Sequence, residues 1–226
     1  VVYLGFVSNM NQVGYYTTAT KIQNINLALY TSFTLVMMPR ISSMLAENDM
    51  ANVKKMISKS FSALYAFAFP TIILSEIFAP EIIFLIAGDG YEQAIPLLRL
   101  AMPLILIIGI EQILIVQLLM PLRAHKMVFT NSLIGGVVGL VFNVLLVGWL
   151  QSTGSVIVWA LSELAVFISA YYFVQKLTSI TISLKEVSKY IASFLILWPI
   201  TLISSLSKML FKSSSTIFSS ILSKSI

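Results

Sequence analysis

Polar and charged side chains inside long apolar stretches are the residues of this sequence that could carry chemistry. A bilayer core offers no water, so each of them must find a partner or face a hydrated cavity. The first stretch carries a polar stripe at steps of four and three residues, which places its members on one helix face. The stripe consists of Thr17, Lys21, Asn24, Ala28 and Thr31.

The stripe combines one cation with neutral polar groups. Such a face predicts the wall of a cavity for an anionic, polar substrate, with Thr17, Lys21, Asn24 and Thr31 as its candidate contacts. The alternative is that Lys21 lies near the outer membrane boundary and extends its ammonium group to the lipid headgroups.

Three further charged residues lie inside apolar stretches. Arg99 is near the end of its stretch, where an arginine ordinarily extends its guanidinium to the headgroups. Glu111 and Glu163 lie near the middle of two other stretches, where a carboxylate is costly unless it is protonated or paired. We expect both carboxyl groups to be hydrogen-bonded or paired with another helix; a proton or cation site used for coupling is the alternative.

The sequence contains no group of residues typical of a catalytic or metal-binding site. It contains no cysteine and one histidine, His125, which excludes a thiol nucleophile and a multi-histidine metal site. Asp89 and Glu92 lie in a glycine-rich connection with no nucleophile or histidine nearby. We therefore expect no enzymatic activity, no cofactor and no metal.

The elements that position these side chains are expected to be transmembrane helices. The sequence is 58% hydrophobic and 10% charged, with a mean hydropathy of +0.94, whereas about 25% of the residues of a soluble domain are charged. A helix needs about 20 apolar residues to cross the bilayer core. Six stretches qualify, at about residues 15–38, 60–78, 95–120, 128–149, 155–174 and 190–206, and a truncated seventh begins near residue 217. The predicted fold class is an all-α, polytopic membrane protein, with residues 1–226 as one transmembrane region.

Basic residues fall on alternate connections between these stretches, nine on one side and none on the other. Such a bias predicts that the basic side is cytoplasmic and that the first stretch enters from outside. The net charge of +5 therefore reflects topology, and no nucleic-acid partner is expected. The nine residues are Arg40, Lys54, Lys55, Lys59, Arg123, Lys126, Lys176, Lys185 and Lys189.

Local patterns predict how some helices pack. The connection at residues 39–59 has apolar residues at near-helical spacing, which predicts an interfacial amphipathic helix or, equally, a basic linker. Gly135 and Gly139 form a G-x-x-x-G pattern, which predicts a close helix–helix approach. Pro70, Pro103 and Pro199 are expected to kink their helices.

Several strings then resemble a known family. VGYYTTATKI opens the first stretch at residues 13–22, and MPRIS closes it at residues 38–42. FAPEII at residues 78–83 leads through Gly88 and Tyr91 to LLRL at residues 97–100. Their order resembles the Wzx-type polysaccharide flippases of the multidrug/oligosaccharidyl-lipid/polysaccharide exporter superfamily, over about residues 1–176. Ser155-Val156-Ile157 departs from the family's small-residue run.

The resemblance implies a transporter of two six-helix lobes that alternates around a central cavity. This chain would be the second lobe, and both of its ends look cut. Wzx-type members move undecaprenyl-pyrophosphate-linked sugar units across the bacterial cytoplasmic (inner) membrane. The implied partners are a lipid-linked oligosaccharide, membrane lipid and the missing N-terminal lobe.

Other functions remain open from the sequence. A multidrug or cation-coupled exporter of the same superfamily could use Glu111 or Glu163, and a peptidoglycan lipid-precursor flippase is a further candidate. A membrane-embedded polysaccharide polymerase or ligase fits less well, because the outer connections are short and contain no histidine.

Overall fold

The structure, a computed structural model, describes residues 1–178. The regular elements of this part are helices, in agreement with the predicted all-α membrane protein. By length and composition, three helical stretches here are apolar enough to cross a membrane. They are Met50–Ala87, Ala94–Leu119 and His125–Leu177. The stretches expected at 190–206 and from 217 lie outside the described residues, as do Pro199, Lys185 and Lys189.

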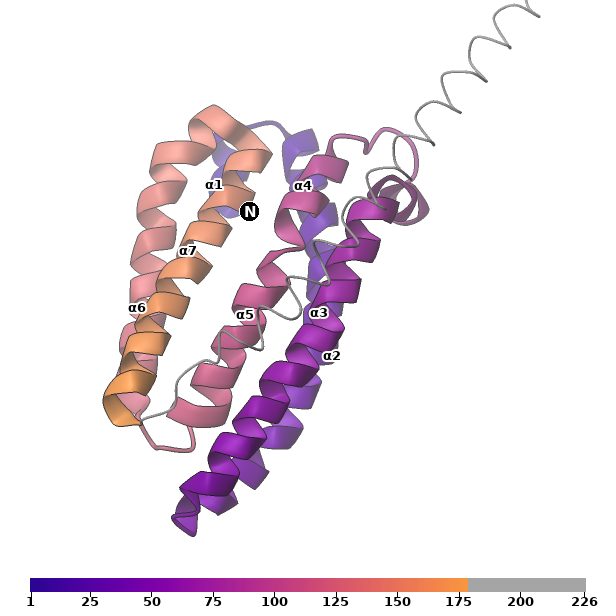
Figure 1. The fold of residues 1–226 in the computed structure, drawn as a ribbon. Coiled ribbons are helices and arrows are strands. Elements are labelled where there is room, and N and C mark those ends of the chain that lie inside the picture. Colours follow the sequence, from indigo (N-terminus) through magenta and orange to yellow (C-terminus); the bar gives the residue numbers. More distant parts are fainter. Residues whose placement is uncertain (179–226) are drawn as a thin grey trace, which may run out of the picture. The chain divides into compact units, whose positions relative to one another are not determined.

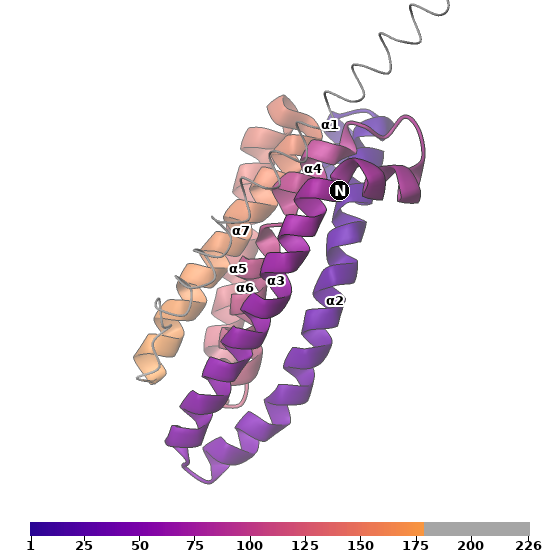
Figure 2. The same ribbon diagram turned by 45° about the vertical axis from the view of Figure 1, so that its right-hand side comes forward.

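Two long helices form an antiparallel hairpin. Helix α2 spans Met10–Ala46 and helix α3 spans Met50–Ala87. At 37 and 38 residues, each is about 55 Å long, well beyond the roughly 30 Å of a bilayer core. In Figures 1 and 2, the hairpin accordingly extends further than the nearby ends of α6 and α7.

The turn of this hairpin is short and has a clear local cause. Asn48 adopts a positive φ of 56°, a conformation that asparagine tolerates better than most residues. Asp49 then caps α3, because its carboxylate accepts hydrogen bonds from the side-chain and backbone N–H groups of Asn52, at 2.6 and 3.1 Å. These two bonds stabilise the ionised form and lower the pKa of Asp49.

The prediction of an interfacial helix or basic linker at residues 39–59 is therefore wrong. Both helices continue through this segment, α2 passing Pro39 without ending. A proline inside a helix removes one backbone hydrogen bond. Here, burial of Ile41 and Val53 at 0% exposure and of Ile57 at 2% favours the continued hairpin, because it removes apolar surface from water.

The third stretch is broken, as its proline predicted. Gly88 and Gly90 lie in the connection that follows α3 with φ values of 76° and 86°, which glycine adopts without steric cost. Helix α4 spans Ala94–Ala101 and α5 spans Leu104–Gln112, so the interruption falls at Pro103. A π-helical segment, η1, follows at Ile113–Leu119. Helix α3 contains Pro70 and Pro80 and is not interrupted at either.

The last described elements fold back on one another. Helix α6 spans His125–Phe142, the π-helical η2 spans Asn143–Val147 and α7 spans Gly148–Leu177. The chain reverses at Gln151, whose φ is 50°, so that α6 and α7 lie side by side (Figure 1). The short first helix, α1, spans Val2–Val7, and its Leu4 packs against Val147 and Val158.

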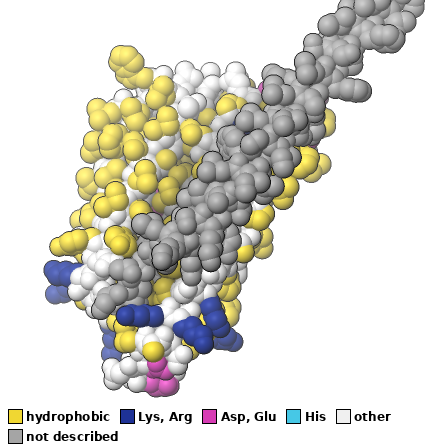
Figure 3. Space-filling view, in the orientation of Figure 1, with side chains coloured by type: hydrophobic (Ala, Val, Ile, Leu, Met, Phe, Trp, Pro, Cys, Tyr) yellow, Lys and Arg dark blue, Asp and Glu magenta, His cyan; other side chains and the backbone are white. Residues whose placement is uncertain are grey.

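Basic side chains gather at the end of this bundle that carries the hairpin turn, below a largely apolar surface (Figure 3). This is the distribution that the alternating connections predicted. We call the seven exposed lysine and arginine residues of this end the basic belt. They are Arg40, Lys54, Lys55, Lys59, Arg123, Lys126 and Lys176.

The G-x-x-x-G prediction is confirmed by the contact between α6 and α7. A methyl group added to Gly135 would lie 2.4 Å from Val166 Cγ2, far inside van der Waals contact. Ser162 Oγ of α7 also donates a hydrogen bond to the Gly135 carbonyl, at 2.8 Å. A side chain at this position would therefore push the two helices apart.

We expect Gly135→Ala to destabilise the protein by about 1–3 kcal/mol, the usual cost of overpacking a tight contact. Gly136→Ala is the matched control, because a methyl group there meets nothing within 4 Å. The measurement is the thermal unfolding midpoint of the purified full-length protein in detergent. Equal midpoints for the two variants would contradict the close approach.

Candidate functional site

A polar cavity of about 370 Å³ lies between α2, α6 and α7. That volume falls within the range of sites for small ligands. Its walls carry hydroxyl, amide and indole groups within otherwise apolar helices, and none of its lining side chains is charged. The lining residues are Val1, Tyr16, Thr20, Asn24, Gly139, Asn143, Ser155, Val158, Trp159 and Ser162.

Helix periodicity brings these groups together. Tyr16, Thr20 and Asn24 follow one another at steps of four on α2, so they form one face. Several of the polar groups are fixed by backbone carbonyls of their own helix. Thr20 Oγ1 donates to the Tyr16 carbonyl at 3.0 Å, and Asn143 Nδ2 donates to the Gly139 carbonyl at 2.7 Å. Their oxygens remain able to accept hydrogen bonds from a ligand.

The stripe predicted on α2 is divided between two environments. Thr17, Lys21, Asn24 and Ala28 are exposed, and Asn24 alone among them lines the cavity. Thr31 turns inward, where its hydroxyl accepts a 2.8 Å hydrogen bond from Gln112 Nε2 of α5.

The cavity face therefore lies one residue away from the face chosen from the sequence. Tyr16 and Thr20 belong to it in place of Thr17 and Lys21. The four-residue spacing of Tyr16, Thr20 and Asn24 could have identified it. The positive charge at Lys21 directed attention to the neighbouring face.

Two mid-membrane carboxyl groups meet beside the cavity. Glu111 of α5 is 5% exposed, and its carboxyl group lies beside that of Glu163 on α7. Trp159, a cavity wall residue, donates its indole N–H to Glu163 Oε1 at 2.7 Å. A polar path thus runs from the cavity through Trp159 and Glu163 to Glu111.

Two carboxyl groups that lie side by side in an apolar interior favour a proton on one of them. Two ionised carboxylates in such close contact repel one another. The pair can therefore hold one proton, or release it when a cation takes its place. In the described part of the chain, no cluster of three or more potential metal-ligating acidic or histidine side chains occurs.

Arg99 has a partner that no sequence signal identified. Its Nε lies 3.7 Å from Glu76 Oε2 and donates to the Glu76 carbonyl at 3.3 Å. The side chains of Arg99 and Glu76 are 42% and 21% exposed. This pair joins α4 to α3 away from the cavity walls.

Comparison with known proteins agrees with the motifs read from the sequence. Residues 2–96 match the family described as "Polysaccharide biosynthesis protein". The chain is 31% identical over 136 residues to a protein of Escherichia coli (strain K12) that bears the name "Putative O-antigen transporter". That match covers 59% of this chain and 32% of the relative, so the chain spans about a third of the length of the curated relative it matches. No solved structure matches the chain.

Single-cysteine variants can test whether the cavity holds water, because the chain has no cysteine of its own. We expect Thr20→Cys in a cysteine-free full-length protein to react with a water-soluble thiol reagent, since only a hydrated thiol ionises readily. The control is Leu140→Cys, an apolar position 71% exposed on α6 that should face lipid. Equal labelling of the two sites in membranes would contradict a hydrated cavity.

Proposed function

We propose, from the premise that this chain is related to the polysaccharide biosynthesis proteins, that it forms part of a flippase. As a multi-pass membrane protein, it would move undecaprenyl-pyrophosphate-linked oligosaccharide units across the bacterial cytoplasmic membrane by alternating access. Its partners would be the lipid-linked substrate, the surrounding lipid and the N-terminal lobe of the same transporter.

The neutral polar cavity between α2, α6 and α7 is the observation that carries this proposal. Sugars present many hydroxyl groups and no net charge, and they are matched by amide and hydroxyl side chains. Asn24, Asn143 and Ser155 supply such groups inside apolar helices. A purely structural bundle has no need of a polar cavity, because buried polar groups are costly unless they are hydrogen-bonded.

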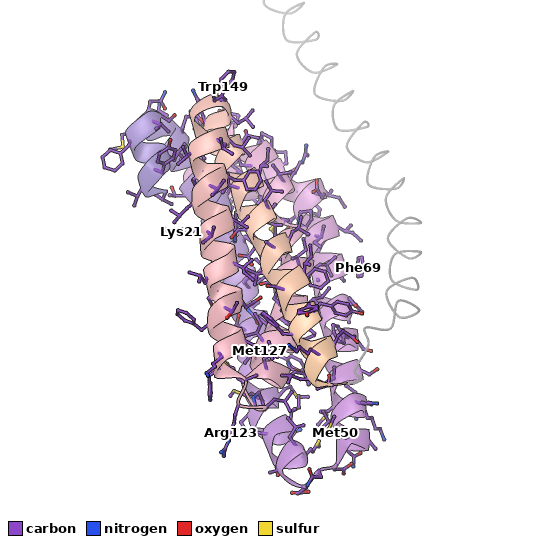
Figure 4. All side chains as sticks on the ribbon, turned by 90° about the vertical axis from the view of Figure 1, so that its left-hand side faces the viewer. Lys21, Met50, Phe69, Arg123, Met127 and Trp149 are labelled. Atoms are coloured by element: carbon purple, nitrogen blue, oxygen red, sulfur yellow. The ribbon has the colours of Figure 1, made fainter. Side chains whose placement is uncertain are left out.

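The exposed face of α2 offers a cation for the anionic pyrophosphate of the same substrate. Thr17, Lys21 and Asn24 are exposed on it, and Figure 4 shows Lys21 between the levels of Trp149 and Met127. We propose that this face borders the central cavity shared with the N-terminal lobe. There the ammonium group of Lys21 would neutralise part of the pyrophosphate charge, while the polyprenyl tail remains in lipid.

The paired carboxyl groups of Glu111 and Glu163 favour a second element of the proposal, which is coupling to a proton or cation gradient. They lie side by side where α5 meets α7. Loss of a shared proton would leave two like charges in contact, and their repulsion would alter how the two helices pack. The same feature would serve a cation-coupled exporter of the superfamily. The carboxyl pair therefore concerns the energy source of transport, whereas the cavity lining concerns the identity of the substrate.

We expect Lys21→Ala to lower surface polysaccharide at least tenfold, because the pyrophosphate would lose its cationic contact. Lys21→Arg should retain export, and Ile25→Ala, at an apolar α2 position that is 61% exposed, is the matched control. The assay measures surface polysaccharide in a strain that depends on the full-length transporter. The membrane abundance of each variant is measured alongside. A normal amount of surface polysaccharide in the Lys21→Ala strain would contradict the proposed role of Lys21.

For the carboxyl pair, we expect Glu111→Gln and Glu163→Gln to abolish the stimulation of transport by an imposed proton or sodium gradient. An amide keeps hydrogen bonding but cannot exchange a proton. Glu92→Gln, in the exposed connection before α4, is the control. Flipping of the lipid-linked unit is followed in proteoliposomes with and without a gradient. A gradient response that survives both substitutions argues against this coupling site.

A further inference from the structure

A second cavity lies at the end of the bundle opposite the basic belt. Its volume is about 430 Å³, and its walls come from the start of α2, the connection before α4 and the turn between α6 and α7. We call it the rim cavity. Its polar and aromatic lining residues are Gln12, Gln93, Trp149, Gln151, Ser152 and Thr153.

One side chain ties these three segments together. Gln12 Nε2 donates to Gln93 Oε1 at 3.3 Å, and Gln12 Oε1 accepts a hydrogen bond from Ser152 Oγ. Ser152 is 5% exposed, so its end of this network is buried. Residues far apart in the sequence are thereby held around one hollow, in a preformed arrangement.

The rim cavity also presents an aromatic surface without a covering partner among the described residues. Trp149, near the start of α7, is 90% exposed and stands at the end of the bundle opposite Arg123 in Figure 4. Two residues later, Gln151 is exposed and has a φ of 50° and a ψ of −128°. Strained backbone of this kind is often found where a side chain must be held at a binding site.

The composition of the rim cavity selects a class of ligand. None of its lining residues is charged, so an anion such as a phosphate would find no countercharge. Three glutamine amides and two hydroxyl groups are suited to the hydroxyl groups of a neutral ligand. The exposed indole offers an apolar face against which the C–H groups of a sugar ring can stack.

We propose that the rim cavity binds a neutral sugar residue of the transported oligosaccharide on the outer side of the membrane. The inference rests on the proposed function only in that the cargo carries sugars. It assigns a separate site, about a bundle length from the basic belt, where the oligosaccharide is held as it leaves the transporter. The competing account of Trp149 is an aromatic anchor at the lipid headgroups, which requires no sugar.

Sugar binding to the purified full-length transporter tests the proposal. The probe is the free oligosaccharide repeat unit, released by mild acid from its lipid-linked pyrophosphate, whose glycosyl–phosphate bond is acid-labile, in the strain that supplies the gene. Its affinity is measured by titration in lipid nanodiscs. We expect Trp149→Ala to weaken binding at least tenfold and Gln151→Ala to weaken it several-fold, whereas Trp149→Phe retains a stacking face and most of the affinity.

Phe129→Ala is the matched control, since Phe129 is an aromatic residue that is 70% exposed in the first turns of α6, away from the rim cavity. Unchanged binding in Trp149→Ala, equal losses in Trp149→Ala and Phe129→Ala, or no binding by the wild type would each overturn the rim site. Thermal midpoints of the variants show whether each remains folded. If Trp149→Ala does not fold, the sugar affinity of the Gln151→Ala variant tests the rim cavity instead.

The outcome is separable from the proposed flippase activity. If the strain lacking the transporter makes normal surface polysaccharide while sugar binding still depends on Trp149, the flippase function fails and the rim site stands. If export depends on the transporter but sugar binding does not depend on Trp149, the rim site alone fails.

Discussion

The absence of water inside a bilayer is the constraint on which the rest of this structure depends. Helix α2 brings an unusual number of polar side chains into the bundle, and each needs a partner. Thr31 finds Gln112 of α5, and the neighbouring face opens onto the polar cavity between α2, α6 and α7. Helix α2 is consequently less apolar than the three stretches whose composition marks them as membrane-crossing. Its place in the bundle depends on its contacts with them.

How far the sequence predicts this arrangement depends on the distance over which each interaction acts. Gly135 and Pro103 act on their own helix and its nearest neighbour, and both predictions hold. The bond between Thr31 and Gln112 joins residues 81 positions apart, and the meeting of Glu111 with Glu163 likewise requires the folded bundle. Hydropathy could place each of these carboxyl groups in the membrane but could not pair them. The same limit explains why Glu76 was not identified as the partner of Arg99.

The hairpin of α2 and α3 shows a different limit of sequence reasoning. Hydropathy falls where the chain leaves the bilayer, so a reading based on apolar stretches ends the helices near residues 38 and 60. Backbone hydrogen bonding has no such boundary, and a helix continues wherever its far side remains packed. Ile41, Val53 and Ile57 supply that packing across the hairpin. The basic belt begins along these continued helices, so the positive charges from which the orientation is predicted are carried partly on helical segments.

The polar features of the chain divide into neutral and ionisable sets, and this division has a physical consequence. Neutral side chains line both cavities, whereas Lys21 stands on the exposed face of α2, Glu111 is buried and Glu163 is half-buried. The proposed substrate, with an anionic head and uncharged sugars, would need the same division, because a cation that holds a pyrophosphate does little to bind a sugar hydroxyl. In the proposed function, each cavity would bind sugar through hydrogen bonds that are individually weak. Weak binding suits a transporter, since a cargo held tightly in any one site would not leave it.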